Sequence, residues 1–166
     1  MGLLSRLMGN EENKNTRSLK PAASTAGIAY DPGLVARLKG DHRELVRIYT
    51  AIKSAAASNR FGELHDLLAQ FKLTFQLHIA MENVKFYVYV QQRMAADSDA
   101  SNFIAEVRRE MNDIARAVLK FVDGYMSIPP TPVTVTAFIA ELDRIGSVLV
   151  QRVEKEETRL YLLYQP

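Results

Sequence analysis

Apolar side chains recur every three or four residues in four long stretches of the chain, over residues 34–56, 64–89, 104–125 and 135–163. This spacing places them on one face of an α-helix. Polar or proline-rich clusters separate the stretches, and apart from the short VTVTAF segment no stretch alternates like a β-strand. We therefore predict an all-α, antiparallel up-down-up-down four-helix bundle formed by residues 31–166.

Residues 1–29 do not continue this pattern, and we predict that they form a mobile tail. The tail is slightly basic, because it carries four of the 21 basic side chains and only two of the 19 acidic ones. Its first residues, MGLLSRLM, place leucine and methionine on one side of a short helical turn. Three interpretations stay open for this segment: an unstructured start, a docking peptide for a protein partner, or a weak membrane-surface anchor.

Composition excludes several classes of protein. No apolar run approaches the roughly 18 residues of a membrane span, so we do not expect a transmembrane protein. Cysteine is absent, which excludes disulfides, iron–sulfur clusters and a cysteine nucleophile, and suits a cytoplasmic location. The charges outside the tail balance, so no basic surface indicates nucleic-acid binding. The oligomeric state is left open.

Five positions on the predicted inward faces are polar, and charged groups are seldom buried without a partner. They are His42, His78, Glu82, Arg152 and Glu156. His78 and Glu82 stand four residues apart and therefore face the same way on a helix. Imidazole nitrogen and carboxylate oxygen together suit iron, manganese or zinc. The candidate metal ligands are thus His42, His78, Glu82 and Glu156, with Asp41 or a backbone carbonyl as the group that orients His42.

The second and fourth stretches contain a repeat. When HIAMENVKFY (78–87) is laid over RVEKEETRLY (152–161), Glu82 falls on Glu156 and His78 falls on Arg152. Both copies occupy the inward face of alternate helices, so the repeat indicates a symmetric bundle. Its mismatch replaces a potential metal ligand with a permanently charged guanidinium.

The DHREL and HIAMENVKFY segments resemble the hemerythrin HHE cation-binding domain, and the resemblance covers residues 31–164. It implies a four-helix bundle with two iron atoms, five histidines and two bridging carboxylates, which binds dioxygen or senses oxygen, redox state or iron. By position, His42 and His78 match ligands of one iron. Glu82 and Glu156 match the bridging carboxylates.

The second half departs from that family pattern, because Met111 and Arg152 stand where histidines of the second iron are expected. The remaining histidine, His65, is expected to be solvated. One interpretation is a sensor with one non-haem iron per chain, with dioxygen as a candidate ligand and Arg152 in place of the second cation. The other is a metal-free interaction module in which Arg152 forms a buried salt bridge with Glu82 and Glu156.

No catalytic motif accompanies these residues. The Glu-x-x-His motif of ferritin-like oxidases, the G-x-S-x-G motif and a phosphate-binding glycine loop are all missing from the sequence. Tyr87, Tyr89, Tyr161 and Tyr164 gather near the helix ends, where we expect rim packing and hydrogen bonding rather than radical chemistry. We therefore do not expect an enzyme.

Overall fold

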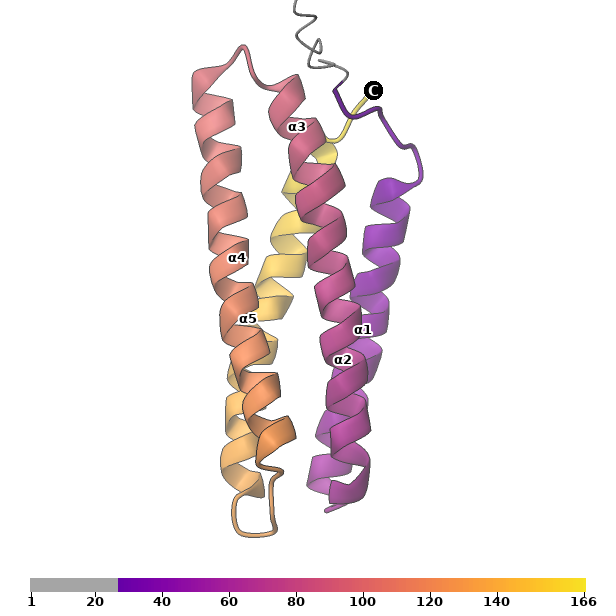
Figure 1. The fold of residues 1–166 in the computed structure, drawn as a ribbon, viewed down its shortest axis with the longest axis vertical. Coiled ribbons are helices and arrows are strands. Elements are labelled where there is room, and N and C mark those ends of the chain that lie inside the picture. Colours follow the sequence, from indigo (N-terminus) through magenta and orange to yellow (C-terminus); the bar gives the residue numbers. More distant parts are fainter. Residues whose placement is uncertain (1–26) are drawn as a thin grey trace, which may run out of the picture.

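The structure, a computed structural model, describes residues 27–166, and all regular secondary structure in this part of the chain is helical. Four helical segments lie side by side along the long axis (Figure 1). In chain order their elements are α1 (Leu34–Ala57), α2 (Phe61–Met81), η1 (Glu82–Phe86), α3 (Tyr87–Arg93), α4 (Ser98–Ser127), α5 (Val135–Lys155), η2 (Glu156–Leu160) and η3 (Tyr161–Leu163). The predicted all-α four-helix bundle is confirmed.

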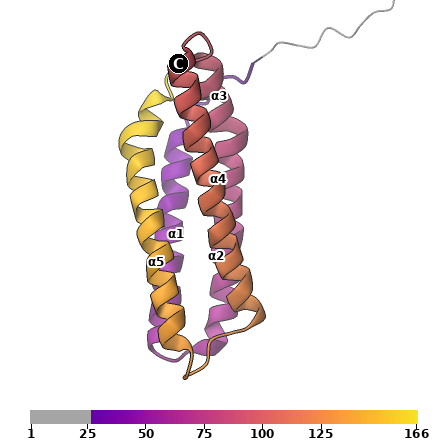
Figure 2. The same ribbon diagram turned by 90° about the vertical axis from the view of Figure 1, so that its left-hand side faces the viewer.

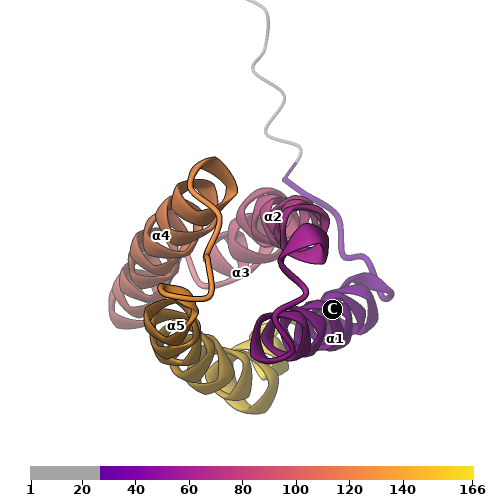
Figure 3. The same cartoon turned by 90° about the horizontal axis from the view of Figure 1, so that it is seen from below.

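The second segment runs without interruption from α2 through the π-helical turn η1 into α3, and the fourth runs from α5 through η2 into η3. Viewed from below, the segments follow one another around the bundle in the order α1, α2, α4, α5 (Figure 3). Their connections lie at alternate ends of the bundle (Figures 1 and 2). Helices that follow one another in the chain are therefore also neighbours in space.

Aspartate side chains stabilise the chain at the start of α4 and just ahead of α1. The Asp97 carboxylate accepts 3.0 Å hydrogen bonds from the backbone N–H groups of Asp99 and Ala100, which have no partner inside α4. Ahead of α1, the Asp31 carboxylate accepts a 3.0 Å hydrogen bond from the Gly33 N–H. α4 therefore begins directly after Asp97, and α1 begins at Leu34, three residues after Asp31.

The core consists of two apolar clusters, with a polar layer between them. One cluster contains Phe71, Phe75 and Phe138, and the other contains Phe86 and Leu160. Along α1, α2–η1 and α5–η2, the five polar residues predicted to face inward stand between residues of the two clusters. Each of these five residues is at most 3% exposed, and this low exposure strengthens the electrostatic interactions among them.

Most of the predicted tail, residues 1–26, lies outside the described residues, so its mobility and the role of MGLLSRLM stay predictions. The last part of that tail packs against the bundle, where the Ile28 backbone N–H donates a 2.9 Å hydrogen bond to Gln92 on α3. None of the helices in the described part combines the length and apolar character that crossing a membrane requires.

Candidate metal centre

The five polar residues of the inward faces are all buried, with at most 3% of each exposed. They are His42 on α1, His78 on α2, Glu82 at the start of η1, Arg152 on α5 and Glu156 at the start of η2. Three of the four helical segments thus supply one polar cluster, as the helical spacing predicts. Because so many ionisable groups are desolvated together, their charges depend on one another.

Three of the four predicted ligands converge on one point. His42, His78 and Glu156 each offer a ligand atom, and these atoms lie within 4.8 Å of one another. His42 Nε2 is 3.2 Å from His78 Nε2 and 3.1 Å from Glu156 Oε2. Two ligands at right angles around a cation, each about 2.1 Å from it, would be ~3 Å apart. Both distances from His42 Nε2 therefore match the spacing of ligands around a transition-metal ion.

The fourth predicted ligand, Glu82, lies beside this group without being part of it. Its Oε2 is 3.9 Å from His78 Nε2, and it has no hydrogen-bond partner among the described residues. Burial, reinforced by the charge of Glu156, raises the pKa of Glu82 to about 8. A buried carboxyl with a free oxygen next to two histidines is the environment that a bound cation would complete.

Glu157 orients His42 within the site. His42 Nδ1 and Glu157 Oε1 are 2.7 Å apart, so the imidazole turns its Nε2 toward His78 and Glu156. Burial opposes a charge on His42, but its hydrogen bonds with Glu156 and Glu157 outweigh burial and raise its pKa. A proton and a metal cation therefore compete for Nε2 of His42.

The prediction that Asp41 orients His42 is wrong. Asp41 Oδ2 instead lies 3.5 Å from His78 Nδ1, which is too far for a good hydrogen bond and leaves that buried nitrogen unpartnered. Burial, together with the charge of His42, lowers the pKa of His78. A neutral His78 keeps a lone pair that is available to a cation.

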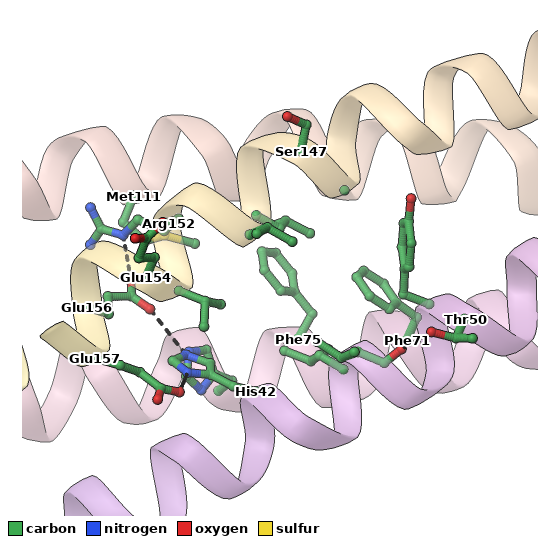
Figure 4. Close-up of a pocket in the computed structure, with 18 of the residues that line it drawn as sticks. His42, Thr50, Phe71, Phe75, Met111, Ser147, Arg152, Glu154, Glu156 and Glu157 are labelled. Atoms are coloured by element: carbon green, nitrogen blue, oxygen red, sulfur yellow. Dashed lines mark hydrogen bonds and ion pairs between the residues drawn. The ribbon is translucent and has the colours of Figure 1, made fainter.

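Arg152 occupies the other side of Glu156. Its Nε donates a 2.5 Å hydrogen bond to Glu156 Oε1, and its Nη2 donates one of 2.5 Å to the Tyr87 hydroxyl. Nη1 is 3.4 Å from Oε2 of Glu110 on α4. No hydrogen bond or ion pair within the described residues joins Arg152 to Glu82. Of the two glutamates expected in a salt bridge with Arg152, only Glu156 therefore forms one. Figure 4 shows this order, with Glu156 between Arg152 and His42.

Two buried tyrosines complete the cluster, although sequence reasoning placed them at the rim. The Tyr161 hydroxyl donates a 2.8 Å hydrogen bond to Glu82 Oε1 and lies 3.3 Å from His42 Nε2. Tyr87 accepts from Arg152, so each repeat's tyrosine serves a residue of the other repeat. The sequence repeat could have indicated that both tyrosines belong to the cluster, because it aligns Tyr87 with Tyr161, five residues after Glu82 and Glu156 respectively.

Both glutamates begin a π-helical turn, Glu82 in η1 and Glu156 in η2. Hydrogen bonds in such a turn run between residues five apart, so the residue at i+5 comes round to the face of residue i. This extra residue per turn brings Tyr87 and Tyr161 inward. In η1 the Asn83 carbonyl also accepts a 3.2 Å hydrogen bond from Arg108 on α4. Because a π-helical turn begins at each of the two aligned glutamates, the backbone shows the same symmetry as the sequence repeat.

The departures from a two-metal site are also visible. Met111 is buried with 3% exposure, and its apolar side chain stands where the resemblance places a histidine. His65 has a largely exposed side chain beside Asp66, as predicted, and takes no part in the cluster. Since the chain contains three histidines in all, no further imidazole is available for a second cation.

Comparison with known protein families adds independent evidence. The model of the hemerythrin HHE cation binding domain family matches residues 33–164. The chain belongs to this family. No curated protein and no solved structure matched the chain. The match to the hemerythrin HHE family spans all four helical segments and every candidate ligand, and the family's description suggests cation binding. The resemblance identified from DHREL and HIAMENVKFY is thus confirmed.

Proposed function

We propose that this chain binds one non-haem iron ion in the bundle core and acts in oxygen, redox or iron sensing. His42, His78 and Glu156 are the proposed ligands, with Glu82 as a further one. The observation that carries the proposal is the convergence of three buried ligand atoms within 4.8 Å. The family's cation-binding description supports it. Bound ferrous iron would supply a redox-active centre able to bind dioxygen.

The chemistry of the donors is compatible with iron. Two imidazoles with one or two carboxylates suit Fe(II), and Mn(II) and Zn(II) share much of this preference. Glu157 holds His42 in the orientation that presents Nε2, and Tyr161 holds one oxygen of Glu82 so that the other faces His78. The chain's own residues thus position the ligands before a cation arrives.

A single cation is favoured because Arg152 stands on the far side of Glu156. The guanidinium neutralises one oxygen of that carboxylate, as a second metal would. Glu110 on α4 adds a second carboxylate to the guanidinium. On this side of the cluster both carboxylates already pair with the guanidinium and no imidazole is present, so few ligand atoms are left for a second cation.

A metal-free interaction module is the second candidate, and one observation favours it. Arg152, Glu156, His42 and Glu157 form a continuous chain of hydrogen bonds and ion pairs that needs no cation. In this case the buried network would fix the geometry of the bundle, and a protein partner would recognise its surface or the MGLLSRLM segment. Substitution of His78 would then leave the function unchanged.

Anaerobic loading with Fe(II), followed by gel filtration and metal analysis, tests the proposal. The wild-type chain should retain iron, and His78→Ala should lose it while keeping its helical circular dichroism. The matched control is His65→Ala, which removes an exposed imidazole far from the cluster and should retain iron. Equal iron in the wild type and in His78→Ala would refute the proposed ligand set. A wild type that retains no iron would favour the interaction module.

A further inference from the structure

A cavity of about 810 Å³ lies between α1 and α5, directly beside the polar cluster. The cavity opens to solvent, and its volume falls within the range of roughly 300–1,000 Å³ seen for small-molecule sites. In Figure 4, His42 and Glu156 lie at one end of the space, and Phe71 and Phe75 line its length.

The wall of the cavity is mainly apolar, and all four helical segments contribute to it. Its apolar side chains include Leu45, Val46, Phe75, Met111, Leu149 and Val150. Val46 on α1 and Val150 on α5 are 54% and 63% exposed, so an apolar entrance faces solvent between the two helices. An apolar molecule could enter here without crossing a charged barrier, and it would leave water on entering.

The charges on the wall indicate which kind of molecule fits. Four carboxylates line the cavity, on Asp143, Glu154, Glu156 and Glu157, and Arg152 is the one guanidinium among the lining residues. An anionic ligand would lose its hydration here without gaining a free cationic partner, because Arg152 already pairs with Glu156.

The wall does not favour a cationic ligand either, because three of these carboxylates already have cationic partners. Lys53 lies 2.6 Å from Asp143, Arg152 lies 2.5 Å from Glu156, and His42 Nδ1 lies 2.7 Å from Glu157. The remaining carboxylate, on Glu154, is exposed to solvent. The wall therefore favours an uncharged molecule.

We propose that this cavity binds an uncharged, mainly apolar organic molecule, with a hydroxyl or carbonyl end directed to the His42–His78 side. The apolar walls would bury its body, and the buried polar atoms at the closed end would hydrogen-bond its head. This inference does not rest on the proposed iron, since cavity and charges belong to the chain itself. A molecule bound here would lie against the candidate ligands and would couple its own binding to any cation held there.

Titration with Nile red, an uncharged fluorescent dye, tests the site in metal-free and iron-loaded protein alike. The wild type should bind about one dye per chain with a blue-shifted emission. Val150→Trp and Val46→Trp place a large ring in the entrance and should each weaken binding about tenfold or more, a loss of at least ~1.4 kcal/mol. Val84→Trp is the matched control, because Val84 on η1 is also 63% exposed and does not line the cavity.

Absence of saturable dye binding by the wild type would overturn the proposal. So would equal binding by both entrance variants and the Val84→Trp control, since the dye would then occupy another surface. Competition between decanol and decanoate tests the charge argument at mildly alkaline pH, where decanoate is ionised. Decanol should displace the dye at about tenfold lower concentration. Equal or stronger displacement by decanoate would contradict an uncharged ligand.

Discussion

Arg152 donates a 2.5 Å hydrogen bond to Oε1 of Glu156, four residues later in the same helical segment. The other oxygen of this carboxylate lies 3.1 Å from His42 Nε2. Glu156 is therefore shared between a fixed cation on one side and a histidine pair on the other. Burial alone would raise its pKa, but His42 and Arg152 outweigh burial and lower it, so the carboxylate stays ionised in the core.

Replacing Arg152 with methionine should leave that ionised carboxylate without its permanent partner. Removing one member of a buried ion pair costs about 3–5 kcal/mol, because the remaining charge stays desolvated. Equilibrium urea unfolding of the metal-free protein measures the loss. Arg109→Met is the control, since Arg109 is exposed and the same substitution there should change stability by less than about 0.5 kcal/mol. Similar losses in the two variants would contradict the pairing.

The periodicity of the sequence was sufficient to predict four helices and the inward direction of the polar residues. A residue's position within the 3.6-residue turn decides its face, whatever partner it later meets. For this reason His42, His78 and Glu156 could be placed in one core from spacing alone. The partners of the side chains could not be predicted, because contacts between Glu157 and His42 or between Arg152 and Tyr87 depend on how the helices are rotated and offset.

The two π-helical turns explain why the sequence did not predict Tyr87 and Tyr161 in the polar cluster. Counted at 3.6 residues per turn, Tyr161 falls well away from the face of Glu156, and Tyr87 stands in the same relation to Glu82. The π-helical turns add a residue to the turn and bring both tyrosines into the polar cluster. The spacing of apolar residues does not reveal a π-helical turn, so it could not predict that these tyrosines are buried beside the glutamates.

Tyr161→Phe should destabilise the bundle by removing the hydroxyl that donates to Glu82 Oε1. Glu82 is 1% exposed and its other oxygen is already unpartnered, so the variant leaves both oxygens of a buried carboxyl unsatisfied. The expected cost is about 1–3 kcal/mol in urea unfolding. Tyr30→Phe, at a partly exposed tyrosine, should change stability by less than about 0.5 kcal/mol. If the two variants unfold alike, the Tyr161 hydroxyl does not support Glu82.

Glu157→Ala should weaken cation binding more than it weakens the fold. The side chain is about one-third exposed, and its main contact is with His42 Nδ1, so its loss frees the imidazole to rotate. Loss of such an orienting carboxylate typically lowers metal affinity about 10–100-fold. Anaerobic Fe(II) titration against a competing chelator measures the affinity. Glu154→Ala, an exposed glutamate one turn earlier, should bind as the wild type does, and equal affinities in both variants would refute the orienting role.

The iron-to-chain ratio at saturating Fe(II) under anaerobic conditions distinguishes one metal site in the bundle core from two sites or none. With Arg152 holding one side of Glu156 and Met111 in place of a histidine, we expect one iron per chain, lost in His78→Ala. Two tightly bound irons per chain would contradict the role of Arg152, and no bound iron would contradict the metal site itself.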